Sequence, residues 1–250
     1  MTHARPQACR PSAFDLFARQ VPVLDAEPAQ AARALLRAAV AISMHELEDA
    51  DPLGVERRIA DLADQVRRRV RSEDPEARLA HLHAVLFDEE GFRGNTEEYY
   101  HPHNSYLPKV LQTRRGLPIT LVLLYTSVAR RLGIPAHGIN APMHFLAGVE
   151  LPTRGSEFSD PQGRPRMLVD VFHQGRVLTP EEFLAQVRRG GTTDPVRPQD
   201  LLPLATPRTW LARMLQNLVN VFQATGRRDD VDAMLELGAL LLGRESADDT

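Results

Sequence analysis

The feature that most constrains this chain of 250 residues is an apolar helix that begins after a Gly-Leu-Pro turn. Proline suits the first helical turn, where its missing N–H is not needed, so a helix is predicted from about Ile119 to Leu132. Its residues are apolar nearly all round, which is typical of a buried helix. Gly133 ends the helix, and an alternating run through Ile139 to Val149 predicts strands that contain His144.

Five sequence strings in and around this helix resemble the transglutaminase-like superfamily, in particular its SirB-type branch. The resemblance covers most of residues 14–243. It implies an α+β fold: a transglutaminase-like (papain-like) core of a buried helix on a small antiparallel sheet, with an N-terminal helical bundle and a C-terminal helical hairpin. The matching strings are GFRGN (91–95), NSYLPKVLQTRRGLPITL (104–121), VARRLGIPAHGIN (128–140), HFL (144–146) and VDVFHQGRVLTPEEF (169–183).

The resemblance also implies where a catalytic triad would lie. The superfamily places a cysteine at the start of the helix, a histidine in the next strand and an aspartate in the strand after. These positions correspond to Pro118, His144 and Asp170. A thiolate at a helix N-terminus is activated by the helix dipole and a nearby imidazolium, and Pro118 has no such nucleophile. We therefore expect a non-catalytic binding or regulatory module.

Asp170 is expected to keep a partner even without catalysis. It lies in the apolar string MLVDVF, and burying an unpaired carboxylate is costly. His144 is the candidate partner, so a retained His144–Asp170 pair is predicted. Cys9 is the only cysteine and lies in a polar leader, far from the motif in sequence.

A hydroxyl nucleophile is the alternative that keeps the site catalytic. Thr120 or Ser105 would attack, with His144 as base and Asp170 as the residue that orients it. Such a protein would be an amide-bond hydrolase or acyltransferase. The other interpretation of Thr120 is a hydroxyl that bonds the backbone within the first helical turn.

Four further residues are expected to line the cleft beside Pro118. Met143 stands in PMHF, where the family more usually has PGHF, and it narrows the site. The string NSY suits turn and cap roles in a loop over the central helix. The cleft-lining residues are Asn104, Ser105, Tyr106 and Met143.

A metal site is a second alternative, based on His101 and His103, because imidazole is a common metal ligand. The His-Pro-His string is short, and no cysteine or Glu-x-x-His motif supports it. We therefore expect no metal and no other cofactor.

Composition limits the partners. The formal net charge of −3 gives no electrostatic case for nucleic acid. No run approaches the ~20 apolar residues that span a bilayer, and the N-terminus lacks the apolar region of a signal peptide. A single cysteine suits a reducing compartment. We expect a cytoplasmic protein that binds a protein or peptide; the sequence does not indicate its oligomeric state.

The order of these patterns predicts six parts. The hairpin looks tetratricopeptide-like, so an adaptor that works through it is a third functional interpretation. The segment 152–166 is expected to be a mobile loop between the His144 and Asp170 strands. The parts are a loose leader (1–12), a helical region (13–90), the transglutaminase-like core (91–191), a Pro-rich linker (192–207), a helical hairpin (208–244) and an acidic tail (245–250).

Overall fold

The computed structural model describes residues 5–141, 144–151, 156–159, 163–189 and 202–243. The chain forms two compact units, each assembled from separate segments. The helical unit comprises residues 1–55, 98–112 and 206–250, and the sheet unit comprises residues 56–97 and 113–205. This grouping differs from the linear division predicted above, because residues 13–90 are shared between the two units.

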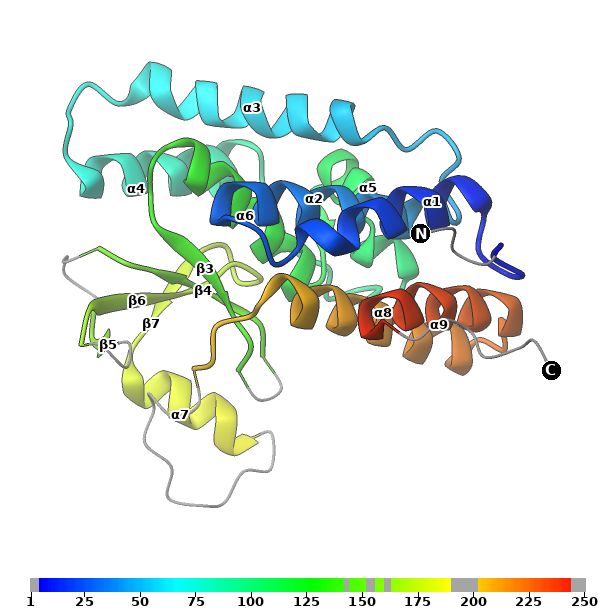
Figure 1. Ribbon diagram of the computed structural model, residues 1–250. Helices are drawn as coiled ribbons and strands as arrows, with labels where there is room; N and C mark the ends of the chain where they lie inside the picture. Colours follow the sequence, from blue (N-terminus) through cyan, green and yellow to red (C-terminus); the bar gives the residue numbers. More distant parts are fainter. Residues whose placement is uncertain (1–4, 142–143, 152–155, 160–162, 190–201, 244–250) are drawn as a thin grey trace. The chain divides into compact units, whose positions relative to one another are not determined.

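The helical unit contains the two ends of the chain and one internal segment. Helices α8 and α9 form an antiparallel hairpin, and α8 also packs on α2, which in turn packs on α1 (Figure 1). Phe17 and Phe222 are fully buried in this unit. Its elements are α1 (Pro11–Gln20), η1 (Val21–Val23), α2 (Pro28–Met44), η3 (Pro102–Ser105), α5 (Leu107–Thr113), α8 (Pro207–Ala224) and α9 (Arg228–Leu242).

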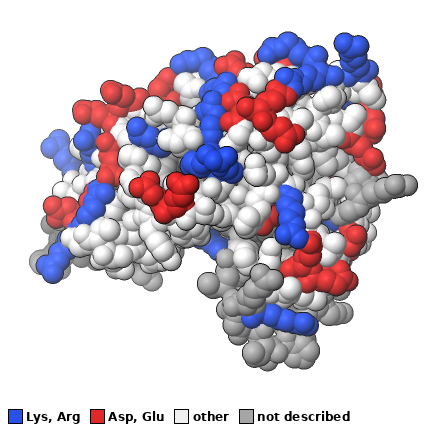
Figure 2. Space-filling view, turned by 180° about the vertical axis from the view of Figure 1, so that it is seen from behind, with Lys and Arg blue, Asp and Glu red and all other residues white. Residues whose placement is uncertain are grey.

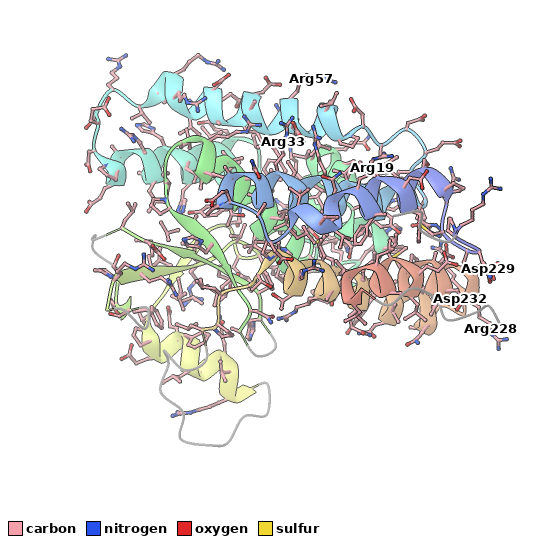
Figure 3. All side chains as sticks on the ribbon, viewed as in Figure 1. Arg19, Arg33, Arg57, Arg228, Asp229 and Asp232 are labelled. Carbon is pink, nitrogen blue, oxygen red and sulfur yellow. The ribbon has the colours of Figure 1, made fainter. Side chains whose placement is uncertain are left out.

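The N-terminal leader is held against α9 where the structure describes it. The backbone N–H groups of Gln7, Ala8 and Cys9 all donate to the carboxylate of Glu236, at 2.8–2.9 Å. The expectation of a loose leader is therefore wrong for this part. In contrast, Arg228, Asp229 and Asp232 near the start of α9 are exposed, and Figure 3 shows them pointing away from the hairpin.

The sheet unit combines a small antiparallel sheet with helices, as the α+β prediction requires. Its helices are α3 (Pro52–Arg69), whose first residues belong to the helical unit, α4 (Pro75–His83), the π-helix η2 (Ala84–Glu89), α6 (Pro118–Arg131) and α7 (Pro180–Arg189). Its strands are β1 (Arg93–Gly94), β2 (Arg115–Gly116), β3 (Ala136–Ile139), β4 (Leu146–Val149), β5 (Phe158–Ser159), β6 (Pro165–Asp170) and β7 (Arg176–Leu178).

The sheet runs β3-β4-β6, and both β5 and β7 pair with β6. Side chains alternate between the two faces of a strand, and one face of this sheet packs on Phe183 and Val187 of α7. Helix α6 contacts β3 and β4, and Figure 1 shows α6 and α7 on opposite sides of the sheet. The strand residues of the α7 face are Ile139, Leu146, Phe158, Leu168 and Leu178.

Local sequence signals explain where the helices begin. Pro118 occupies the first turn of α6. The carboxylate of Asp51 accepts from the N–H groups of Leu53 and Gly54 at the start of α3. Thr179 and Glu182 form a reciprocal capping box before α7, with bonds of 3.1 and 3.2 Å.

Three local predictions need correction. His144 precedes β4 instead of lying in a strand, and its N–H donates to the carbonyl of Ala141 at 3.2 Å. The predicted linker pairs with β3 at its end, through an isolated bridge between Leu204 and Ile139. The segment 152–166 contributes β5 and the first residues of β6, whereas residues 152–155 and 160–162 lie outside the described part.

Charged side chains of both signs are interspersed over the face shown in Figure 2. No large surface of one sign is seen on that face, in keeping with the small net charge. Among the helices that the structure describes, none is both long enough and apolar enough to span a bilayer.

Candidate functional site

The start of α6 is the centre of the candidate site in the sheet unit. Leu117 and Ile119 on either side of Pro118 are buried, whereas Pro118 itself is partly exposed. The carbonyl of Leu117 accepts from the N–H groups of Thr120 and Leu121, which begins the helical hydrogen bonding. The first turn of this buried helix thus carries a partly exposed prolyl ring.

A short backbone ladder joins this helix start to the end of β6. Strand β1 pairs in parallel with β2, which immediately precedes α6. The N–H of Asn95 donates to the carbonyl of Gly116 at 3.2 Å, and the N–H of Gly94 donates to the carbonyl of Phe172 at 2.8 Å. A Cβ at Gly94 would lie 2.4 Å from the Phe172 ring. Only glycine lets β1 lie this close to the residues that follow Asp170.

The sheet register brings His144 and Asp170 to the same end of the sheet. Ala147 of β4 pairs with Val169 of β6, so the antiparallel register places Leu146 opposite Asp170. His144 lies two residues before Leu146, outside β4, on the segment that enters the strand at this end. The ladder through Gly94 adds the start of α6 to this end. The backbone thus brings these three segments to one end of the sheet, and the catalytic arrangement with its His144–Asp170 side-chain pair stays a prediction.

The described contact of the Asp170 side chain is with His173. Its Oδ2 lies 2.8 Å from Nδ1 of His173, and its Oδ1 accepts the backbone N–H of His173 at 3.2 Å. The Asp170 side chain is 6% exposed, whereas that of His173 is 63% exposed. Sequence reasoning missed this pair. The signal in the sequence was a histidine three residues after the aspartate and two residues before a glycine, because this spacing suits a tight turn.

The hydroxyl of Thr120 is isolated in the core. Thr120 is fully buried, and within the described part of the chain its Oγ1 has no hydrogen-bond partner. A hydroxyl nucleophile needs its base within about 3 Å. The other interpretation of Thr120 is also wrong, because its hydroxyl does not bond the backbone of its own turn. Its neighbour Thr126 does so, donating to the carbonyl of Val122 at 2.9 Å.

The loop residues assigned to the cleft make contacts inside the helical unit. Asn104 donates through Nδ2 to the carbonyls of Glu98 and Tyr99, at 2.6 and 3.1 Å, which is the turn role expected of it. Ser105 is 2% exposed, and Tyr106 is fully buried. Such a buried side chain does not line an open cleft, so that assignment of Tyr106 is corrected. Met143 lies outside the described residues.

The two remaining candidates are the His-Pro-His string and Cys9, and neither has the surroundings of a metal site or of a reactive thiol. Nδ1 of His101 accepts the backbone N–H of His103 at 3.2 Å. No group of three potential metal-binding side chains occurs within the residues that the structure describes. Cys9 is buried, and burial together with the nearby Glu236 raises the pKa of its thiol to about 12. A thiol in this state is a poor nucleophile.

Comparison with known proteins identifies the family. The profile described as "Transglutaminase-like superfamily" matches residues 54–216. A UPF0162 protein of Xylella fastidiosa is 39% identical over 61% of this chain and 51% of its own length. Human F-box only protein 21 is 31% identical over 62% of this chain and 23% of its own length. A UPF0162 protein of Pseudomonas aeruginosa is 28% identical over 84% of this chain and 74% of its own.

The match therefore spans about half the length of the Xylella protein and about a quarter of the human one. No solved structure matches the chain.

Proposed function

Because the chain belongs to the transglutaminase-like superfamily, we propose that it is a non-catalytic module that binds a protein or peptide. Within the superfamily we assign it to the SirB-type branch, on the strings around the central helix. The observation that carries the proposal is Pro118 at the first position of α6, the position to which the resemblance assigns the thiol of the superfamily. A prolyl ring offers neither a nucleophile nor a backbone N–H at the helix start.

Neither Cys9 nor Thr120 supplies the nucleophile that Pro118 lacks. The thiol of Cys9 has a raised pKa and belongs to the other unit. The Oγ1 of Thr120 is buried and has no partner among the described residues, so no base is in place to activate it. These observations disfavour the Thr120 form of the alternative, an amide-bond hydrolase or acyltransferase that uses Thr120 or Ser105 with His144 and Asp170, and the Ser105 form is left to the experiment below.

The comparisons support a binding role through the contexts in which the domain occurs. The matched segment makes up about half of one relative and about a quarter of another, whose name is F-box only protein 21. A domain found in chains of such different length acts as a portable module. Fold alone does not set function, so the mode of binding has to come from the site.

The edge of the sheet offers a mode of binding for an extended peptide. Strand β7 pairs with β6, and in the described part of the chain it has no second strand partner. Val177 in the middle of β7 is 37% exposed. Extended peptides bind such edges by adding a strand, with main-chain hydrogen bonds for affinity. We place the bound peptide along β7, beside the turn that follows Asp170.

The experiment separates binding from catalysis. Peptides selected from a displayed random library against the full chain should bind the wild type and lose at least tenfold in affinity against Val177→Asp, because a charge on an edge strand blocks strand addition. Leu235→Asp, at an exposed position of α9 in the other unit, is the matched control and should bind normally. Equal binding by both variants would exclude the β7 edge.

Catalysis is tested on the same preparations. The wild type should neither release ammonia from glutamine-containing peptides nor couple them to a primary amine. Turnover by the wild type that disappears in Thr120→Val or Ser105→Ala would establish the enzyme interpretation and overturn the non-catalytic one.

A further inference from the structure

We infer that His173 is an activated imidazole that accepts acyl groups at Nε2, and that activated acyl donors such as anhydrides and acyl phosphates are its chemical class of reagent. This property goes beyond the proposed binding function and does not depend on it. It rests on the hydrogen bonding, the exposure and the fixed position of one side chain.

The Asp170 carboxylate determines which ring nitrogen of His173 carries hydrogen. Oδ2 of Asp170 lies 2.8 Å from Nδ1, and an ionised carboxylate accepts hydrogen bonds but cannot donate them. The hydrogen of the neutral ring is therefore on Nδ1, and the lone pair is on Nε2. A carboxylate that accepts from one nitrogen of an imidazole also fixes the tautomer and the orientation of the ring. Histidine with a free, electron-rich nitrogen is a recognised nucleophile.

The Asp170 side chain is buried, whereas the His173 side chain is exposed to reagents in solution. The carboxylate side chain is 6% exposed, so water competes little for it, whereas the imidazole is 63% exposed. Oδ1 of Asp170 accepts the backbone N–H of His173 at 3.2 Å, which fixes the carboxylate orientation. The pair thus has a buried acceptor and an accessible nitrogen.

The turn that carries His173 is held by its backbone. The N–H of Gly175 donates to the carbonyl of Asp170 at 3.0 Å, and the N–H of Arg176 donates to that of His173 at 3.3 Å. Gln174 and Gly175 both have positive φ, 55° and 75°, which closes the turn tightly. The imidazole packs edge-on against Phe172, whose ring lies against Gly94. These contacts hold the ring of His173 in one place.

His101 provides a matched contrast within the same chain. It is also exposed, but its Nδ1 accepts the N–H of His103 at 3.2 Å. The hydrogen of its neutral ring is then on Nε2, so its outward nitrogen has no free lone pair. Two exposed imidazoles of one protein therefore present opposite tautomers to solvent.

Diethyl pyrocarbonate is the probe, and it transfers an ethoxycarbonyl group to Nε2 of His173. The Nε2 lone pair attacks one carbonyl carbon, and a C–N bond forms. The anhydride C–O bond breaks, and its electron pair leaves with monoethyl carbonate. The Nδ1 hydrogen passes to Asp170 and from there to solvent, so the product is a neutral ethoxycarbonyl-histidine. No oxidant, reductant or metal takes part.

The test is the rate of modification of each histidine, followed by peptide mass mapping of the full chain at about pH 8, where exposed imidazoles of ordinary pKa are neutral. His173 should react about tenfold faster than His101, the lower end of the effect that the hydrogen-bond partners of metal-bound imidazoles have on affinity or activity. Asp170→Asn should remove this advantage. Equal rates for His173 and His101 in the wild type would overturn the inference.

A second measurement keeps the inference testable if Asp170→Asn does not fold. Long-range ¹H–¹⁵N NMR spectra of the wild type report the tautomer of each ring, and His173→Gln identifies the signals. We expect an unprotonated Nε2 in His173 and a protonated Nε2 in His101. A hydrogen on Nε2 of His173 would contradict the structure-based assignment, whatever the fate of the proposed peptide binding.

Discussion

The hydroxyl of Tyr106 donates a 2.6 Å hydrogen bond to Oε2 of Glu46, and the other carboxylate oxygen accepts from Arg227. The network continues to Asp230, which accepts from Nε of Arg227 at 2.7 Å and lies 2.8 Å from Nε2 of His45. These residues come from all three chain segments of the helical unit. A polar network therefore ties the segments together, and Tyr106 belongs to it instead of to a cleft.

Tyr106→Phe should destabilise the helical unit by about 2 kcal/mol, the usual net value of a hydrogen bond to a charged group. Burial, and the proximity of Glu46, raise the pKa of the phenol, so it is a hydrogen-bond donor at neutral pH. Urea denaturation followed by circular dichroism measures the loss. Tyr100→Phe, at a position that is 77% exposed, is the control and should unfold like the wild type. Equal midpoints for the two variants would refute the structural role of the bond.

Thr120→Val should stabilise the sheet unit by about 1 kcal/mol. The variant keeps the shape of the side chain and removes a buried hydroxyl that has no partner among the described residues. Thr126→Val on the same helix is the matched control. It removes a buried hydroxyl that bonds the carbonyl of Val122, so it should be neutral or destabilising by up to about 1 kcal/mol. Thermal unfolding of both variants gives the comparison, and a destabilised Thr120→Val would reveal a partner for that hydroxyl.

Gly94→Ala should cost about 1–3 kcal/mol, the range for overpacking in a filled interior. The added methyl would lie 2.4 Å from the ring of Phe172, which must move with the turn that carries His173. Gly238→Ala is the contrasting variant, because a Cβ there meets nothing within 4 Å inside α9. It should stabilise the protein by up to about 1 kcal/mol. Chemical denaturation distinguishes the two, and two stabilised variants would contradict the close contact of β1 with Phe172.

The parts of the fold that follow from local signals could be predicted from the sequence. Pro118 marks the start of α6, and Thr179 with Glu182 marks the start of α7, because a helix cap uses residues within one turn. The α+β class came from the resemblance and is confirmed by the match to the superfamily. These predictions needed no knowledge of long-range contacts.

The contacts that the sequence did not reveal depend on distant or conformational details. Glu46 and Arg227 are 181 residues apart, and no local pattern links them. The bond from Asp170 to His173 belongs to a turn in which Gln174 has positive φ, a conformation that few non-glycine residues adopt. A buried carboxylate could be expected to have a partner, but the choice between two histidines could not be made from spacing alone.

The stability of the sheet unit should fall as the pH drops from about 6.5 to about 4, because of His83. Nε2 of His83 lies 2.9 Å from the hydroxyl of Tyr125, and burial lowers the pKa of the imidazole to about 4. The unfolded chain, with an ordinary pKa near 6.5, binds the proton first, so acid favours unfolding over this range. The full shift corresponds to about 3 kcal/mol. Denaturation midpoints measured across the range should slope less in His83→Gln, and identical slopes would contradict the assignment.

Glu236→Ala should expose the only cysteine of the chain. Three backbone N–H groups of the leader, including that of Cys9, donate to Glu236. The Cys9 residue is 3% exposed, and the pKa of its thiol is raised to about 12. The wild-type thiol should therefore resist a disulfide reagent at about pH 8, and loss of the carboxylate should let the leader detach. Glu48→Ala is the control, since its pair with Arg10 is on the surface. Spectrophotometric thiol titration should show rapid reaction of Glu236→Ala alone. Rapid reaction of the wild type would mean that Cys9 is accessible, and it would return a thiol to the list of candidate nucleophiles.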